Sequence, residues 1–398
     1  MLDTFVVTVT PPEILNLPMG FSCHVSNVGV KDGSRDFTVV ASDAPCSAAG
    51  VFTRSRFAGP SVEISRRHVA DGSARAVVVV SKNANVANGA RGRADAEELV
   101  SGVALRLGVA TQEVLLASTG VIGRPYPMDR IRAGIAGLPV PLPGHDAIDV
   151  ARGIMTTDTV HKIAATDIAG SRARIVGVAK GVGMIEPDMA TLIALIFTDA
   201  AIEPPDLDAV FRRVIDATLN CVSVDTDTST SDTAVILASG AAGTVAIDAF
   251  ETALHGVLLD LTKKIARDGE GAETLVEVRV DRALDRAQAK TVAKAIVNSP
   301  LVKTAIHGAD PNWGRVAMAI GKCSDHDDID QDDVVIRFGD QEVYPKQIDA
   351  AGLASLSRYM AGDEVLVHVS LGTGDASATV WGCDLTDGYV RINADYTT

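Results

Sequence analysis

Apolar and polar positions follow two different periods along this chain. Short apolar runs at residues 76–80, 114–117 and 175–178 are bounded by turn-forming residues, which is typical of buried strands. Between the first two runs, apolar residues recur every three or four positions over residues 99–107, and Gly108 follows them. This spacing predicts an amphipathic helix that ends at the glycine. The chain therefore alternates strands with helices.

The same spacing predicts three more helices, at residues 207–215, 250–265 and 283–297, with Asp206 as the N-cap of the first. Near the C-terminus the pattern changes to a period of two over residues 364–371, as in a strand with one buried face. Glycine-rich turns separate this strand from two more expected strands, at 377–381 and 388–392. We found no internal repeat and no linker-like stretch, so the pattern predicts a layered mixed α/β protein without a domain boundary visible in composition.

Composition narrows the class of protein. With 398 residues, 47% apolar and 22% charged, the chain is long enough for two or three structural units or one large layered unit. The net charge of −15 disfavours nucleic acid and anionic membranes as partners. The longest apolar run, 189–197, is far shorter than the roughly 20 residues of a membrane helix. The N-terminal residues also lack the features of a signal peptide, so we expect a soluble, cytoplasmic protein.

Several common catalytic arrangements are missing from the sequence. The five cysteines form no CxxC pair, the eight histidines are dispersed, and no Ser-His-Asp or Cys-His spacing can be recognised. Residues 324–334 contain six aspartates but lack the central glycine and closing glutamate of a calcium loop. We interpret them as a solvated acidic loop and expect a reaction that uses no metal.

The most informative segment is KGVGMIEPDMAT, residues 180–191, which leads into an apolar strand. Its GxG element lacks both the third glycine of a dinucleotide-binding loop and the GK[ST] of a P-loop, so a nucleotide site is not indicated. If the chain is cut between Ala190 and Thr191, the new α-amine lies beside the threonine hydroxyl. An α-amine has a pKa near 8 and can act as the base that activates this nucleophile. The more common alternative is a threonine that simply opens a buried strand.

Other polar segments could support such a nucleophile. Residues 115–123, LLASTGVIG, run from a strand into a small glycine-bearing turn that could form an oxyanion hole, or could be an ordinary strand-end turn. The hydroxyl- and carboxylate-rich runs 155–159 and 223–233 are either hydrogen-bonded turns or pocket linings. Residues 307–315, HGADPNWGR, indicate a turn whose Trp and Arg side chains pack or border a pocket.

These motifs together resemble a known family. KGVGMIEPDMATLIALIFTDA (180–200) is similar to the self-cleavage segment of the ornithine acetyltransferases, which are bifunctional glutamate N-acetyltransferases of arginine biosynthesis. The likeness also covers FTRSRFA (52–58), STGVIG, MTTDT, DTDTSTSDT, HGADPNWGR and the ending RINADYTT, in the same order. Several long motifs in order are far more specific than any one of them.

The resemblance implies a layered αββα fold, shared with DmpA-type aminopeptidases, and autocatalytic cleavage between Ala190 and Thr191. The products would be an α chain of residues 1–190 and a β chain of residues 191–398. These would stay associated as α2β2 or larger assemblies. The acetyl group of N-acetylornithine would move to glutamate in ping-pong order, through an acetylated Thr191, without a cofactor. Whether acetyl-CoA is an alternative donor stays open.

The resemblance also assigns roles to single residues. Thr191 is the nucleophile, and Thr119 and Gly120 match the oxyanion-hole positions. A cation suits the substrate carboxylate, and a carboxylate suits the distal ammonium of ornithine, which are the roles of Lys180 and Glu270. The substrate-binding positions that match the family are Thr157, Lys180, Thr191, Glu270, Asn393 and Thr398.

The sequence departs from the usual family pattern: Val182 stands where serine is usual, Thr226 where glycine is usual and Ser231 where asparagine is usual, and the segment KNAN at residues 82–85 also diverges. The DTDTSTSDT form is similar to the branch that includes the clavulanic acid cluster paralogue. The pathway is therefore left open between arginine synthesis and specialised metabolism. Two further alternatives remain: an amidohydrolase or aminopeptidase on the same scaffold, and an uncleaved binding or structural homologue.

Overall fold

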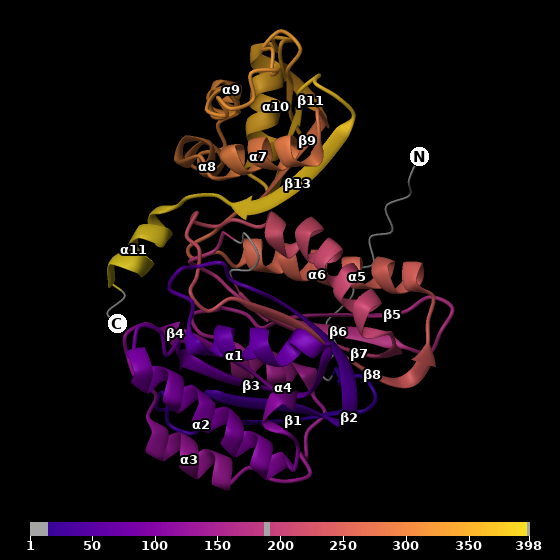
Figure 1. Ribbon diagram of the computed structural model, residues 1–398. Coiled ribbons are helices and arrows are strands. Elements are labelled where there is room, and N and C mark those ends of the chain that lie inside the picture. The colour runs from indigo at the N-terminus through magenta and orange to yellow at the C-terminus, as the bar shows by residue number, and fades with distance from the viewer. Residues whose placement is uncertain (1–14, 187–191, 396–398) are drawn as a thin grey trace.

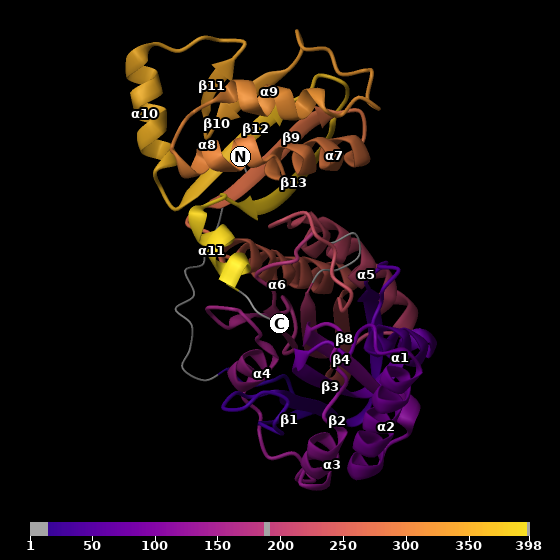
Figure 2. The same cartoon turned by 90° about the vertical axis from the view of Figure 1, so that its left-hand side faces the viewer.

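The structure, a computed structural model, describes residues 15–186 and 192–395. They form a large lobe and a smaller lobe that pack against each other (Figures 1 and 2). Among the described helices, none combines the length and the apolar character needed to cross a membrane.

The large lobe is built on one eight-stranded sheet, in the order β4-β3-β2-β8-β7-β6-β5, with β1 beside β2. The long strand β2 belongs to two layers: its first part pairs with β1 and β3, its last part pairs with β8, and its register against β3 shifts between Ala41 and Cys46. The sheet therefore folds over itself. Its strands are β1 (Phe21–Ser26), β2 (Phe37–Phe52), β3 (Ser73–Asn83), β4 (Val114–Val121), β5 (Lys162–Asp167), β6 (Arg174–Lys180), β7 (Ile193–Ala201) and β8 (Thr233–Thr244).

Alternating side chains connect the layers. On β7, Ile193, Leu195 and Phe197 join the core between the two halves of the sheet, whereas Ala194 and Ile196 join the core beneath the outer helices. The Phe197 ring lies 5.2 Å from the ring of Phe21 on β1, across the interior. Because successive residues of a strand face opposite sides, one apolar strand can serve both cores.

Helices cover both outer faces of the folded sheet. One group packs on β3 and β4, a second group packs on β6, β7 and β8, and α4 lies in the core between the layers. This arrangement confirms the layered αββα prediction. The helices of the first face are α1 (Pro60–His68), α2 (Gly89–Leu107) and α3 (Met128–Ala136), those of the second are α5 (Pro204–Ala217) and α6 (Ile247–Arg267), and α4 is Ala147–Ile154; single 3-10 turns are η1 (Val69–Asp71), η2 (Thr111–Glu113) and η3 (Leu219–Cys221).

The smaller lobe has a five-stranded sheet in the order β11-β10-β12-β9-β13. Its core is continuous with the core around α6, so the two lobes share apolar packing. Its strands are β9 (Leu275–Ala283), β10 (Val335–Phe338), β11 (Gln341–Tyr344), β12 (Glu364–Ser370) and β13 (Ala376–Cys383), and its helices are α7 (Arg286–Val297), α8 (Pro300–His307), α9 (Trp313–Gly321) and α10 (Ala350–Met360).

After β13 the chain leaves the smaller lobe and forms α11 (Asp387–Asp395), which lies against the large lobe (Figure 2). The prediction of a strand at residues 388–392 is therefore wrong. The segment follows the point where the chain has left the five-stranded sheet, so its backbone groups are satisfied by a helix instead. An ion pair between Arg391 and Asp387, one turn apart, supports that helix.

The predicted helix ends have mixed outcomes. Gly108 ends α2 with a φ of 71°, as expected. Asp206 is not the N-cap of α5, because Glu203 holds that position and two prolines fill the first turn. Asp206 lies inside the first turn, where its negative charge interacts favourably with the helix dipole.

The predicted chain boundary after residue 190 falls between β6 and β7, which are neighbours in one sheet. The two lobes are thus not the two predicted chains.

Candidate functional site

Six of the predicted site residues line one cavity of about 310 Å³ in the large lobe. They come from separate parts of the sequence, and Leu192, the first described residue after the predicted cleavage point, lines the same cavity. Ala190, Thr191 and Thr398 lie outside the described residues. The six are Thr119, Gly120, Thr157, Lys180, Glu270 and Asn393.

Thr119 and Gly120 lie at the end of β4, where it runs parallel to β3. The strand continues through both residues to Val121, so the expected turn is instead a strand end with a shifted register. Gly120 has a φ of 128°, and a Cβ at this position would lie 2.2 Å from the carbonyl carbon of Lys82. Only glycine allows this close approach of two backbones.

The described part of the cleavage segment is held by hydrogen bonds from three directions. The Gly181 N–H donates to Asp158 Oδ1 at 2.8 Å, and the N–H groups of Met184 and Ile185 both donate to the Asp225 carboxylate at 2.7 Å. The Glu186 N–H donates to the Asp227 carbonyl at 3.0 Å. Carboxylates that accept backbone N–H groups fix loops strongly, so the chain enters the cavity region in a defined conformation.

Gly183 makes room for Glu270. A Cβ on Gly183 would lie 2.5 Å from the Glu270 carboxyl group, and the Glu270 N–H donates to the Val182 carbonyl at 2.9 Å. The GxG element of the segment therefore admits a carboxylate and does not form a phosphate-binding loop.

Glu270 connects three elements at the mouth of the cavity. Its Oε2 accepts a hydrogen bond from Asn393 Nδ2 of α11 at 2.9 Å, and its Oε1 lies 3.4 Å from the Thr157 hydroxyl. The Thr386 hydroxyl donates to the Gly271 carbonyl at 2.6 Å and anchors the approach to α11. The C-terminal segment thus returns to the cavity, as the sequence predicts for Asn393.

A buried charge network lies behind Lys180. Lys162 is fully buried, and its Nζ lies 2.7 Å from Asp158 Oδ1 and 2.5 Å from Asp268 Oδ2. Asp158 also holds the Gly181 N–H, so the network supports the residue that follows Lys180. The polar run at residues 155–159 was recognisable in the sequence. The individual roles of Asp158 and Lys162 were not, because their pairing depends on the tertiary fold.

The network perturbs several pKa values. Burial raises the pKa of Asp158, but the charges of Lys180 and Lys162 outweigh burial and hold it at about 2. Burial lowers the pKa of Lys180, and Asp158, Asp232 and Glu270 oppose that effect while Lys162 adds to it. Lys82, mainly through burial, has a pKa of about 8. Lys180, which lines the cavity, and Lys82, whose charge acts on the same network, therefore both have lowered pKa values, and perturbed pKa values are typical of functional sites.

We predict that Lys162→Met lowers the free energy of unfolding by about 3–5 kcal/mol, because it removes the cation that the buried Asp158 and Asp268 carboxylates share. Chemical denaturation monitored by circular dichroism measures this. The matched control is Lys264→Met, which removes an ion pair with Asp260 whose side chains are 42% and 50% exposed and should cost no more than about 1 kcal/mol. Equal effects of the two substitutions would contradict the role given to the buried network.

Residues 223–233, expected to be either hydrogen-bonded turns or a pocket lining, are both in the structure. Ser229, Thr230, Ser231 and Asp232 line the cavity. The Thr53 N–H donates to the Asp232 carbonyl at 3.1 Å, so the FTRSRFA segment supports this wall from behind. Asp232 was missed as an individual residue, and the only signal was its place at the end of the hydroxyl-rich run.

The structure describes the surroundings of two positions that depart from the family pattern, Thr226 and Val182. Thr226 has a φ of 69°, a conformation that glycine adopts freely and a β-branched residue rarely adopts. This is where glycine is usual. Val182 is 2% exposed, so its apolar side chain is buried.

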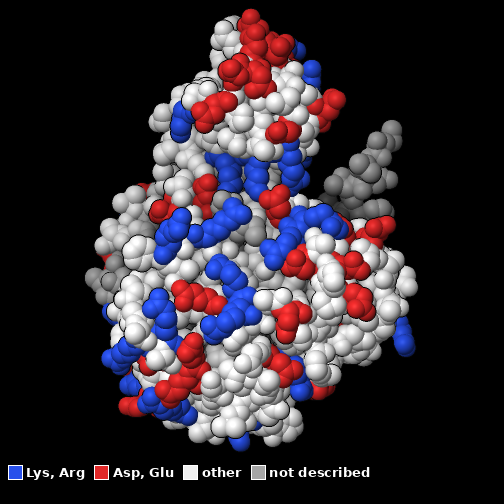
Figure 3. Space-filling view, in the orientation of Figure 1, with Lys and Arg blue, Asp and Glu red and all other residues white. Residues whose placement is uncertain are grey.

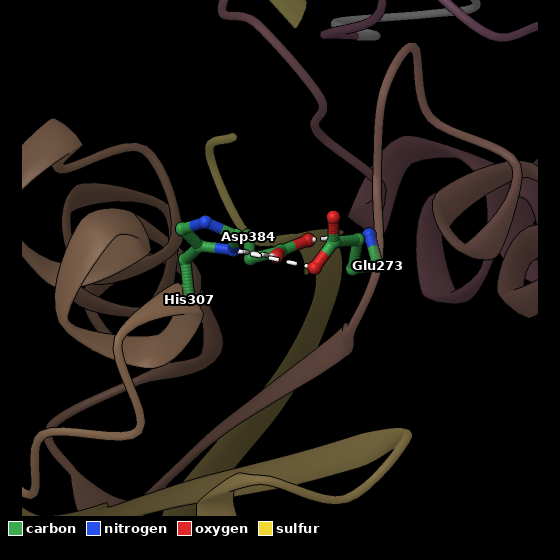
Figure 4. Close-up of side chains that lie close together, drawn as sticks. All are labelled: Glu273, His307 and Asp384. Atoms are coloured by element: carbon green, nitrogen blue, oxygen red, sulfur yellow. Dashed lines mark hydrogen bonds and ion pairs between the residues drawn. The ribbon is translucent and has the colours of Figure 1, made fainter. Parts of the chain in front are cut away.

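A second cluster of ionisable groups consists of Glu273 before β9, His307 on α8 and Asp384 after β13 (Figure 4). His307 Nδ1 lies 3.2 Å from Asp384 Oδ2 and 3.6 Å from Glu273 Oε2. Among the described residues this is the one group whose ligand atoms converge as in a metal site. Asp384 Oδ1 already accepts the N–H groups of Glu273 and Thr274, so hydrogen bonding accounts for the cluster as a tie between α8, β9 and β13. The absence of a metal from the reaction stays a prediction.

The acidic loop and the tryptophan motif have structural roles. All six aspartates of residues 324–334 are exposed, in agreement with a solvated loop. Figure 3 shows acidic side chains gathered at the outer end of the smaller lobe. Trp313 begins α9, stacks on Tyr344 with ring centroids 4.9 Å apart, and borders a cavity of about 500 Å³. The predicted pocket-edge role of this tryptophan is thereby confirmed.

Comparison with known proteins gives the family. The ArgJ family matches residues 22–398. The chain is 58% identical over 381 residues to arginine biosynthesis bifunctional protein ArgJ 2 of Nostoc sp., covering 96% of this chain and 98% of the relative. It is 56% identical over 388 residues to glutamate N-acetyltransferase Oat2 of Streptomyces clavuligerus, with the same coverage. A crystal structure of arginine biosynthesis bifunctional protein ArgJ from Bacillus halodurans is 40% identical, covers 50% of this chain and 96% of that chain, and has a TM-score of 0.47. This chain belongs to the ArgJ family.

Proposed function

We propose that this protein is a glutamate N-acetyltransferase that moves the acetyl group of N2-acetyl-L-ornithine to L-glutamate in arginine biosynthesis. One observation carries the proposal: the oxyanion-hole, carboxylate-binding and ammonium-binding residues assigned from sequence line a single cavity, and Leu192 borders it. Relatives named as ArgJ proteins and as a glutamate N-acetyltransferase match nearly the whole chain and support the same reaction.

The chemistry follows from residue types. After cleavage between Ala190 and Thr191, the α-amine of Thr191 takes the proton of its own hydroxyl as the oxygen attacks the acetyl carbonyl. Thr119 and Gly120 stabilise the negative charge on the carbonyl oxygen. Ornithine leaves with a proton on its amine, and glutamate then attacks the acetyl ester by the reverse sequence. Because the acetyl group is held on the Thr191 oxygen between the two steps, ornithine leaves before glutamate is acetylated, which is a ping-pong order.

Substrate recognition rests on opposite charges. Lys180 is 8% exposed and, among the described residues, donates no hydrogen bond, so its ammonium is available for the substrate carboxylate. Glu270 faces the cavity with its two oxygens directed to Asn393 and Thr157, and it would receive the distal ammonium of ornithine. Thr398, at the C-terminus, would complete the site together with Asn393.

The proposal also covers the acetyl donor, the assembly of the cleaved chains and the pathway that the enzyme serves. The reaction needs no metal or cofactor, acetyl-CoA is an alternative donor to be tested, and the two cleaved chains form α2β2 or larger assemblies. Ser231 and Thr226 favour keeping a specialised-metabolite route as the alternative pathway. Release of acetate without glutamate would favour the hydrolase alternative.

The test is the denaturing intact mass of purified protein incubated with and without N-acetylornithine. We expect two fragments of similar size, and the C-terminal fragment should gain one acetyl mass with the substrate. Two fragments without added mass would keep the self-cleaving scaffold and move the search to other acyl donors. A single uncut chain would overturn the nucleophile mechanism and favour the binding homologue.

A further inference from the structure

Asp232 is a buried carboxyl group in the cavity wall that the proposed mechanism does not use. It directly precedes β8, lines the cavity and is 2% exposed. Its Oδ2 has no hydrogen-bond partner among the described residues. A buried carboxylate oxygen without a partner is costly, so such a group either binds something or carries a proton.

The surroundings of Asp232 favour the proton. Burial raises its pKa well above the usual value, and the opposing effects of the Ser229 hydroxyl, the Lys180 charge and the Leu192 N–H do not cancel this. Behind Lys180, Lys162 is shared between the Asp158 and Asp268 carboxylates, at 2.7 and 2.5 Å, and the Asp158 charge also acts on Lys180. Other charged side chains at this cavity or beside Lys180 are Glu270, from the loop after α6, and Lys82, from β3.

We propose that Asp232 is a positioning residue which, by keeping its proton, adds no further negative charge beside the Lys180 ammonium and so leaves it ready to bind the carboxylate of the amino-acid substrate. The inference rests on the proposed function, in which both donor and acceptor carry such a carboxylate. An ionised Asp232 would pair with Lys180 and repel the incoming carboxylate. The side chain thus controls anion affinity through the charge balance of the site and not through contact with the reacting atoms.

Asp232→Asn separates this role from that of an ionised partner of Lys180, because asparagine has the same shape and no charge. At neutral pH the KM for glutamate of Asp232→Asn should match that of the wild type, with kcat within about threefold. As the pH increases, the KM of the wild type should rise more steeply than that of Asp232→Asn, because Asp232 ionises only in the wild type whereas Lys180, whose pKa burial lowers, loses its proton in both. The matched control, Asp227→Asn, removes an exposed carboxylate from the same segment and should keep the wild-type profile. A KM raised about tenfold at every pH in Asp232→Asn would overturn the proposal.

Unfolding measurements test the proton without catalysis. A carboxyl group whose pKa is raised by folding makes the folded chain less stable as the pH rises from the unfolded to the folded pKa, and has no such effect below both values. The melting temperature of Asp232→Asn should therefore exceed that of the wild type at neutral pH, and the difference should shrink toward pH 4. A lower melting temperature of Asp232→Asn at neutral pH would show that folding does not raise the pKa of Asp232 and would overturn the proposal. Inactive wild-type protein would refute the acetyltransferase proposal, while this comparison would still decide the protonation state.

Discussion

Thr191→Ala should leave the protein as one uncut chain of 41.4 kDa and reduce acetyl transfer by about a thousandfold or more. The hydroxyl is proposed to act twice, first in cutting the chain and then in carrying the acetyl group. Alanine offers no oxygen for either step. Denaturing gel electrophoresis and a glutamate acetylation assay measure the two effects.

Thr191→Ser is the matched control for this substitution. Serine keeps both the hydroxyl and, after cleavage, the neighbouring α-amine, so cleavage and transfer should persist at a reduced rate. Transfer by uncut Thr191→Ala at a rate close to that of the wild type would show that another group is the nucleophile.

Gly120→Ala should reduce kcat by about 10²–10³-fold, the usual cost of losing an oxyanion-hole donor. The new Cβ would overlap the Lys82 backbone at 2.2 Å, so the end of β4 must move away from β3. The left-handed φ of 128° adds strain of about 1–3 kcal/mol, which should also lower the melting temperature.

Gly123→Ala isolates the contribution of backbone conformation. Gly123 also has a positive φ, of 81°, but a Cβ there would meet no atom within 4 Å. This variant should lose a little stability and keep most of its kcat. If Gly120→Ala and Gly123→Ala lower kcat equally, the close contact with Lys82 is not what positions the oxyanion-hole residues.

Much of the site was predictable because it consists of contiguous motifs. The segment at residues 180–191 and the STG at 118–120 carry their chemistry in short runs of fixed spacing. Family resemblance then assigned Lys180 and Glu270, and the structure places both at one cavity. Their convergence could not be derived from spacing, since they lie 90 positions apart in the sequence, with β7, α5, β8 and α6 between them.

Other features could not be predicted because they depend on partners distant in sequence. Asp158, Lys162 and Asp268 form a network only when the 155–162 turn meets the end of α6. The strand expected at residues 388–392 is a helix, since a strand needs a neighbour to satisfy its backbone and a helix does not.

By itself, the sequence determined the alternation of strands and helices, the absence of common metal and nucleotide motifs, and the candidate nucleophile with its cleavage point. These are local properties, carried by periodicity and by short motifs. Tertiary structure alone decided that the large sheet folds over itself, that α11 returns to the cavity, and that Asp232 is buried beside Lys180. Burial and charge pairing arise when distant segments exclude water together, and no local pattern encodes them.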